Sequence, residues 1–140
     1  MTKEEKQLLL KDLCAREPYH PRIRIFNQGG YDGFRAWEDD NNLWFYHIGA
    51  FRLGKIKILP YLRPMSSMTE EEKEEYTSYC FEQPFLQKDK TPNLGSVPMC
   101  IDWLIAHNFD YRGLIPMGLA LEAPEGMYKL VEYICQTFDN

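Results

Sequence analysis

The hydrophobic pattern of this chain changes period along its length, and that change constrains the fold more than any other feature. Arg22–Ile25 and Lys55–Ile58 alternate basic and apolar side chains, which is the period-two pattern of half-buried strands. Val97–Ile105 instead repeats apolar residues every three or four positions, the stripe of an amphipathic helix. Strands grouped ahead of helices predict an α+β fold.

The predicted sheet is a small antiparallel β-meander over about residues 22–59. Further strands are expected at Phe34–Trp37 and at Leu43–Ile48, and the continuous apolar and aromatic run of the latter is the expected central strand. A polar turn at 39–42 separates these two strands. Pro60 is expected to close the sheet, because proline cannot donate to a strand ladder.

Helices are expected on both sides of the sheet in the sequence. A capping box at Thr2 and Glu5 opens an N-terminal helix that runs to about Ala15. Three to four C-terminal helical segments follow the sheet, and they pack with the N-terminal helix against it. Their expected starts are a capping box near Thr69, Ser96, Asp110 and Pro124. Residues 1–140 are expected to form a single domain, because a chain of this size can bury its own core.

Aromatic residues and cysteines add to this expectation. The chain contains 3 Trp, 9 Tyr and 8 Phe, and rings are expected to dominate the core because each buries roughly 150–250 Å². The four cysteines form no C-x-x-C pair, so neither zinc nor redox chemistry is indicated. No apolar run is long enough for a signal or transmembrane segment. A cytoplasmic protein with reduced thiols and no membrane association is therefore predicted.

The charge distribution supplies the first candidate binding surface. The net charge is −5, and the basic surplus of residues 16–63 is small, which argues against a nucleic-acid partner. If the isoleucines of the two alternating segments face the core, the cations between them share the opposite face. An acidic protein patch, a nucleotide or the glutamate helix of a second copy could bind there. Solvation, helped by pairing with residues 70–75, is the competing explanation. The four cations are Arg22, Arg24, Lys55 and Lys57.

The run Asp110-Tyr111-Arg112-Gly113 supplies the second candidate. It places a carboxylate, a phenol and a guanidinium beside a flexible glycine at an expected helix start. Arg112 and free backbone N–H groups could bind an anion there, so Asp110 and Arg112 join the candidate binding residues. The simpler interpretation is that Asp110 caps the turn and Arg112 pairs with a local acid.

No set of residues predicts catalysis, metal binding or a cofactor. Cys100 and His107 lie on one predicted helix, about 10 Å apart in rise, which is too far for a nucleophile and its base. The glutamates at 70–75 diverge around their helix instead of converging on a cation. The glycine-rich run at 27–30 lacks the Lys-Ser/Thr of a phosphate-binding loop.

Three parts of the chain have distinctive sequence motifs: LLLKDLCAR at 8–16, YLRPMSSMTEEEK at 61–73, and FDYRGLI with GLALEAPEGMY at 109–115 and 118–128. They resemble a family of short uncharacterised proteins encoded by gut anaerobes and their mobile elements. The resemblance covers less than half of the chain. That family has no known activity, so the resemblance implies no site residue. It implies an accessory protein of the cytoplasm.

These features favour a non-enzymatic accessory protein that acts as a protein–protein interaction module, with a protein partner or a second copy of itself. One alternative is a small-ligand or nucleotide-binding protein that uses Arg112 or the basic strand face. A second alternative is a hydrolase whose catalytic residues form no recognisable motif. Mass determination in solution tests self-association, and a thermal-shift screen with nucleotides and metals tests the first alternative.

Overall fold

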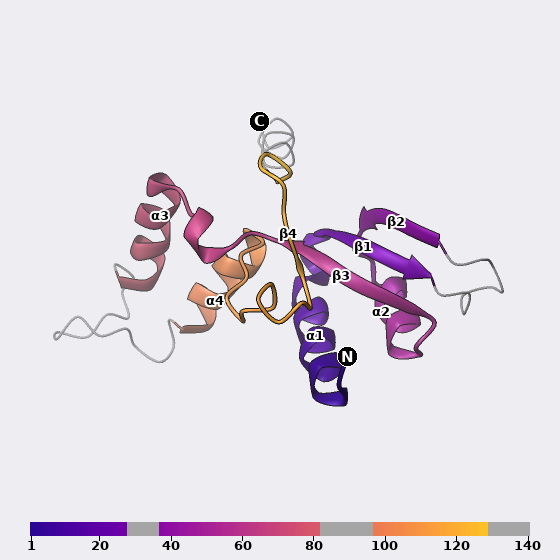
Figure 1. Cartoon of the computed structure of the whole chain (residues 1–140). Helices are drawn as coiled ribbons and strands as arrows, with labels where there is room; N and C mark the ends of the chain where they lie inside the picture. The colour runs from indigo at the N-terminus through magenta and orange to yellow at the C-terminus, as the bar shows by residue number, and fades with distance from the viewer. Residues whose placement is uncertain (28–36, 82–96, 129–140) are drawn as a thin grey trace.

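The computed structural model describes residues 1–27, 37–81 and 97–128, and it confirms the α+β class (Figure 1). Single-turn 3₁₀ segments at Glu17–Tyr19 and Met65–Ser67 join the larger elements. Those elements are, in chain order, α1 (Lys3–Arg16), β1 (Arg22–Asn27), β2 (Trp37–Asn42), α2 (Phe45–Arg52), β3 (Ile56–Leu62), α3 (Glu70–Phe81), α4 (Val97–Ala106) and β4 (Leu121–Glu122).

The described sheet has four strands in the order β2-β1-β3-β4. β1 is antiparallel to both of its neighbours, so Arg24 lies opposite Asp40 of β2 and Leu59 of β3. β4 is parallel to β3, with Leu121 opposite Tyr61. The sheet is therefore mixed, whereas a purely antiparallel meander was predicted. The parallel pair arises because the chain passes through α3 and α4 before it returns to β3, the long connection that parallel strands require.

The segment between β1 and β3 differs most from the prediction. Leu43–Ile48 does not form a central strand, because the chain turns into α2 at Phe45. A short apolar run does not distinguish a strand from a half-buried helix, and α2 buries Ile48 and Phe51 on one side at a spacing of three. The polar residues predicted as a turn form β2 instead. An edge strand tolerates such residues because only one of its sides is paired.

Two smaller strand predictions also change. Pro60 lies inside β3 and does not end it. The proline is accommodated because pairing between β3 and β4 begins one residue later, at Tyr61. Of the strand predicted at Phe34–Trp37, only Trp37 lies within the described residues, where it begins β2.

The main core lies where α1 and α2 pack against the sheet (Figure 1). The isoleucines of the alternating segments face this core, as predicted. The cluster is almost entirely aliphatic, so the prediction that rings dominate the core is wrong here. Rings instead gather in a second cluster, where Trp103 and Phe109 pack with Leu104 beside α3. The fully buried members of the main core are Leu9, Leu13, Ile23, Leu43, Ile58, Leu62 and Leu114.

The predicted helix starts are confirmed at two capping boxes. The backbone N–H of Glu5 donates to Thr2 Oγ1 over 3.0 Å, and the N–H of Thr2 donates to Glu5 Oε1 over 2.8 Å. Thr69 and Glu72 make the same reciprocal pair at the start of α3. Ser96 and most of the helix predicted after Pro124 lie outside the described residues. No helix of the described ranges is long and apolar enough to cross a bilayer.

The cysteine prediction holds only in part. Cys14 is free and exposed on α1. Cys100 is disulfide-bonded, so the prediction that it is a reduced thiol is wrong. Distance along the sequence did not reveal this, because a disulfide requires only that two Cα atoms come within about 7 Å in the fold.

Candidate functional site

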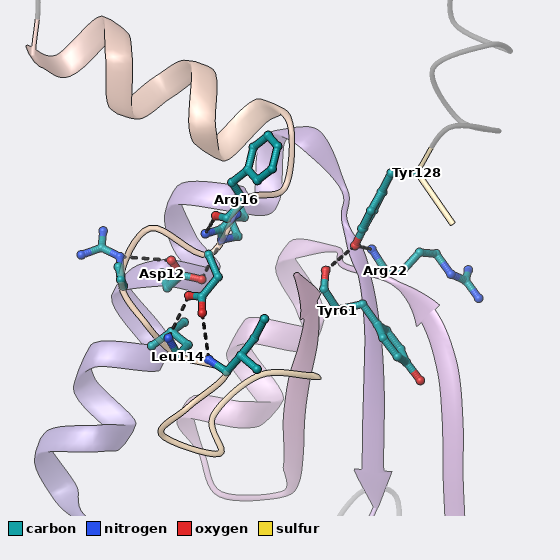
Figure 2. A network of polar contacts seen from close by, with 10 residues as sticks. Asp12, Arg16, Arg22, Tyr61, Leu114 and Tyr128 are labelled. Carbon is teal, nitrogen blue, oxygen red and sulfur yellow. Dashed lines mark hydrogen bonds and ion pairs between the residues drawn. The ribbon is translucent and has the colours of Figure 1, made fainter. Parts of the chain in front are cut away.

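A buried polar network joins α1 to the segment that follows α4 (Figure 2). The side chains of Asp12 and Arg16 are completely buried, with 0% exposure each. Arg16 Nε donates to Asp12 Oδ2 and Arg16 Nη2 donates to the carbonyl oxygen of Phe109, each over 2.7 Å. Arg112 Nε donates to Asp12 Oδ1 over 3.1 Å. One carboxylate therefore holds two guanidinium groups.

Asp110 and Arg112 lie together, as predicted, but each is bound within the protein. The carboxylate of Asp110 accepts hydrogen bonds from the backbone N–H groups of Leu114, at 2.8 Å, and Ile115, at 2.9 Å. It therefore caps a turn, which matches the simpler interpretation. The N–H groups proposed to hold an anion already have a carboxylate partner. A bound anion would have to displace Asp110 from them and compete with Asp12 for Arg112.

The basic strand face has internal partners as well. The antiparallel register places Arg22 and Arg24 of β1 on the face that carries Lys57 of β3. Arg22 Nη1 donates to Asn42 Oδ1 over 2.8 Å. Lys57 Nζ lies 5.7 Å from the centroid of the Phe26 ring. Lys55 is exposed just before β3. These cations do share a surface, with Lys55 at its margin.

The acids that neutralise this face come from an unexpected element. Arg24 lies 3.7 Å from Glu38 and 3.6 Å from Asp40, both on β2. The hydroxyl of Tyr61 donates to Asp40 Oδ1 as well. Pairing with the glutamates of α3 was part of the solvation explanation weighed from the sequence. The difference follows from the turn predicted at 39–42, because these residues belong to the strand that neighbours β1.

The glutamates of α3 have their own partner. Arg63 makes a two-pronged ion pair with Glu72, at 2.7 and 2.6 Å, and its guanidinium lies over the Phe109 ring. Burial alone raises the pKa of Glu72, but hydrogen bonds from Arg63 and Thr69 outweigh it and lower that pKa to about 2. A hollow of about 1140 Å³ lies between α3 and residues 122–128, and six of its sixteen lining residues are glutamates. Among the described residues, no group of three ligating side chains could hold a metal ion.

Sequence reasoning missed a group of exposed aromatic side chains on the described surface. It is an aromatic patch where the end of β2 meets the start of α2, formed by His20, Trp44, Phe45 and Tyr46, and the ring centroids of Phe45 and Tyr46 lie 6.1 Å apart. Phe45 is 73% exposed, and the side chains of Tyr19, Trp44 and Tyr46 are also exposed. The rings of His20 and Trp44 contact each other with centroids 4.0 Å apart. Three consecutive aromatic residues at a helix start are a usable signal, because successive helical side chains point in different directions and cannot all face the core.

Hydrogen bonds hold the backbone of the aromatic patch in place. The N–H of Trp44 donates to His47 Nδ1 over 3.0 Å, so the proton of this imidazole lies on Nε2. The N–H of Leu43 donates to the carbonyl of Pro21 over 2.8 Å, and Leu43 itself is fully buried. Burial lowers the pKa of His47, and this effect outweighs the charge of Asp39, which raises it. The lowered pKa favours the neutral imidazole, whose Nδ1 can accept the hydrogen bond from Trp44. The rings are therefore displayed on a fixed backbone.

Comparison of the chain with protein-family models, curated proteins and solved structures finds no match. The resemblance drawn from the sequence remains a prediction.

Proposed function

We propose that this protein is a non-enzymatic accessory protein that binds a protein partner through the aromatic patch. The exposed rings of Trp44, Phe45 and Tyr46 carry this proposal. Tryptophan and tyrosine are enriched among residues that dominate binding energy at protein interfaces. Contiguous exposed apolar surface on a soluble domain marks interaction sites more often than single exposed residues do.

The energy available at the patch is large enough to matter. A phenylalanine buries roughly 150–250 Å², and apolar burial stabilises by about 25 cal/mol per Å². Covering the exposed 73% of Phe45 would therefore contribute about 3 kcal/mol before entropic costs. The ordered backbone reduces those costs, because little freedom remains to be lost when a partner binds.

A cytoplasmic location and an accessory role complete the proposal. Both rest on the resemblance of residues 8–16, 61–73, 109–115 and 118–128 to the family named above, and the location rests on it alone because the disulfide at Cys100 is more typical of an oxidising compartment. The net charge of −5 supports a protein partner over nucleic acid.

The small-ligand and nucleotide alternative has weaker support. Its candidate cations Arg22, Arg24 and Arg112 each have a partner inside the protein. To bind, a ligand must therefore interact with these cations more strongly than their partners inside the protein do. A thermal-shift screen with nucleotides would reveal a ligand that does so, because binding to the folded state alone raises the melting temperature.

Affinity capture from the native host tests the proposal. The baits are the natural chain, the double variant Phe45→Ala/Tyr46→Ala, and the control Leu53→Ala. Leu53 is 71% exposed at the other end of α2, so its replacement removes apolar surface outside the patch. Quantitative mass spectrometry should find a partner retained by the natural chain and the control, and reduced about tenfold or more with the double variant. Equal recovery on all three folded baits would overturn the proposal.

A further inference from the structure

β2 lies at one edge of the described sheet, beside β1 alone (Figure 1). An edge strand presents backbone N–H and C=O groups outward, and extended peptides can add to such an edge as a further strand. The six residues of β2 offer a template about 20 Å long at roughly 3.3 Å per residue. The aromatic patch begins two residues beyond its last residue, Asn42.

The side chains of this edge give it a negative charge. Glu38, Asp39 and Asp40 are consecutive and exposed. In the described part of the chain, Arg24 is the cation within ion-pair distance of Glu38 and Asp40, and it is shared between them. Side chains alternate along a strand, so Asp39 lies on the opposite face, where no ion pair to it is formed by the described residues. Both faces of the edge therefore carry carboxylate charge.

A strand added at β2 would meet these carboxylates first. Its side chains would lie about 4.5–5.5 Å from those of β2 in directly opposed pairs. Arg22 and Arg24 belong to the next strand inward, but the guanidinium of Arg24 reaches to 3.7 Å from Glu38 and 3.6 Å from Asp40 and offsets part of their charge. The three carboxylates of Glu38, Asp39 and Asp40 outnumber these two cations, so the edge keeps a net negative charge. The nearest charges thus favour a basic segment.

A second copy of the chain does not fit this edge. Antiparallel pairing of β2 with itself would oppose the acidic residues of one copy to those of the other. Directly opposed like charges destabilise a strand pair. Charged edge residues are a known means by which proteins prevent self-pairing of sheets. The charges that exclude a second copy are the ones that attract a basic partner.

We infer that the partner binds through a basic, extended segment that pairs with the free side of β2 as a further strand. An apolar residue at one end of this segment covers the aromatic patch. The inference rests on the proposed function and specifies the partner's chemistry. Lysine or arginine at alternate positions would lie beside Glu38 and Asp40, which share one face. The end of the segment would lie beside Trp44 and Phe45.

Selection from a displayed library of random twelve-residue peptides tests the inference. The selected peptides should be net positive, with basic residues at alternate positions and an aromatic or large apolar residue near one end. A synthetic peptide of the selected sequence should bind about tenfold or more weakly to Glu38→Gln/Asp39→Asn/Asp40→Asn, and its affinity should fall as salt rises. The matched control Glu70→Gln/Glu71→Gln/Glu74→Gln removes the same charge from the exposed face of α3 and should change affinity less than about twofold. Amide exchange along β2 should slow when the peptide binds.

The possible outcomes separate the two proposals. Neutral or acidic selected peptides, an empty selection, or unchanged binding to the β2 variant would overturn the inference. A dimer in sedimentation that the β2 variant abolishes would overturn it as well. If binding depends on Phe45 and Tyr46 but not on the β2 carboxylates, the inference fails while the proposed function stands. If the natural chain and the Phe45→Ala/Tyr46→Ala variant capture the host partner equally well, both the proposed function and the inference fail.

Discussion

Replacement of Asp12 by asparagine is expected to destabilise the fold strongly. Asp12 is fully buried and accepts hydrogen bonds from both Arg16 and Arg112. Asparagine has one acceptor oxygen and no charge, so it can serve one guanidinium and leaves the buried charge of Arg16 uncompensated. Arg16 also has an Nη1 group without a hydrogen-bond partner in the described structure. Removing one partner of a buried ion pair typically costs about 3–5 kcal/mol, and we expect a loss in that range.

Urea denaturation followed by tryptophan fluorescence measures this loss. A native domain is stable by only about 5–15 kcal/mol, so the change is a large share of the total. The melting temperature should fall by about 10 °C, since a domain near this size loses roughly 2–4 °C per kcal/mol. Glu4→Gln is the matched control on the same helix, because it removes one exposed carboxylate from the first turn of α1. Its expected cost is about 0.3–1 kcal/mol, from the helix dipole.

A loss below about 1 kcal/mol for Asp12→Asn, with an unchanged dependence on urea, would refute the reasoning. It would mean that the charge of Asp12 does not hold α1 to the segment after α4. A change in that urea dependence would instead report an altered unfolded or native state.

Two further predictions concern polar contacts near the C-terminal end of β3. The pKa of Glu72 in the folded protein is about 2, below its ordinary value of 4.5, so its contribution to stability is complete above about pH 5 and is lost as the pH falls toward 2. Urea titrations between pH 7 and pH 3 should show a smaller acid-induced loss in Glu72→Gln than in the natural chain, and equal losses would contradict the assignment. The hydroxyl of Tyr128 donates to the carbonyl of Tyr61 and accepts from the N–H of Arg22. Tyr128→Phe should therefore cost about 1–3 kcal/mol in the same assay, because buried backbone groups lose a partner, and a cost near zero would show that water replaces it.

The parts of the fold that follow from local chemistry were predictable from the sequence. The capping boxes at Thr2 and Thr69 are local, because donor and acceptor lie three residues apart. The burial of the alternating isoleucines also followed from the period-two pattern of a strand alone. α2 was not predictable in this way, since its apolar run suits a strand equally well. The decisive factor was the tertiary position of β2 at the edge, which allows a polar strand and leaves residues 45–52 to pack as a helix.

The candidate site was less predictable for the same reason. The spacing of Asp12 and Arg16 suggests a helical pair, but nothing in the sequence shows that both are buried or that Arg112, 100 residues away, joins them. Alternation correctly grouped the basic side chains of β1 and β3 on one face. Their acidic partners went unrecognised because residues 39–42 were predicted as a turn.

The distinctive stretches of the sequence meet in the fold, which their separation along the chain does not reveal. The N–H of Arg63 donates to the carbonyl of Asn108, and the N–H of Asp110 donates to the carbonyl of Arg63. The hydroxyl of Tyr128 reaches the backbone of Tyr61. These long-range contacts form the frame on which β3, α4 and the capped turn are assembled.

Binding of the captured partner to purified protein tests the role of the aromatic patch most directly. Isothermal calorimetry would compare the natural chain with Phe45→Ala/Tyr46→Ala at matched melting temperature. We expect the dissociation constant to rise about tenfold or more, which corresponds to at least about 1.4 kcal/mol of lost binding free energy. Leu53→Ala should bind like the natural chain. Affinity of the double variant within about twofold of the natural chain, roughly 0.4 kcal/mol, would contradict the proposal that the partner binds at this patch.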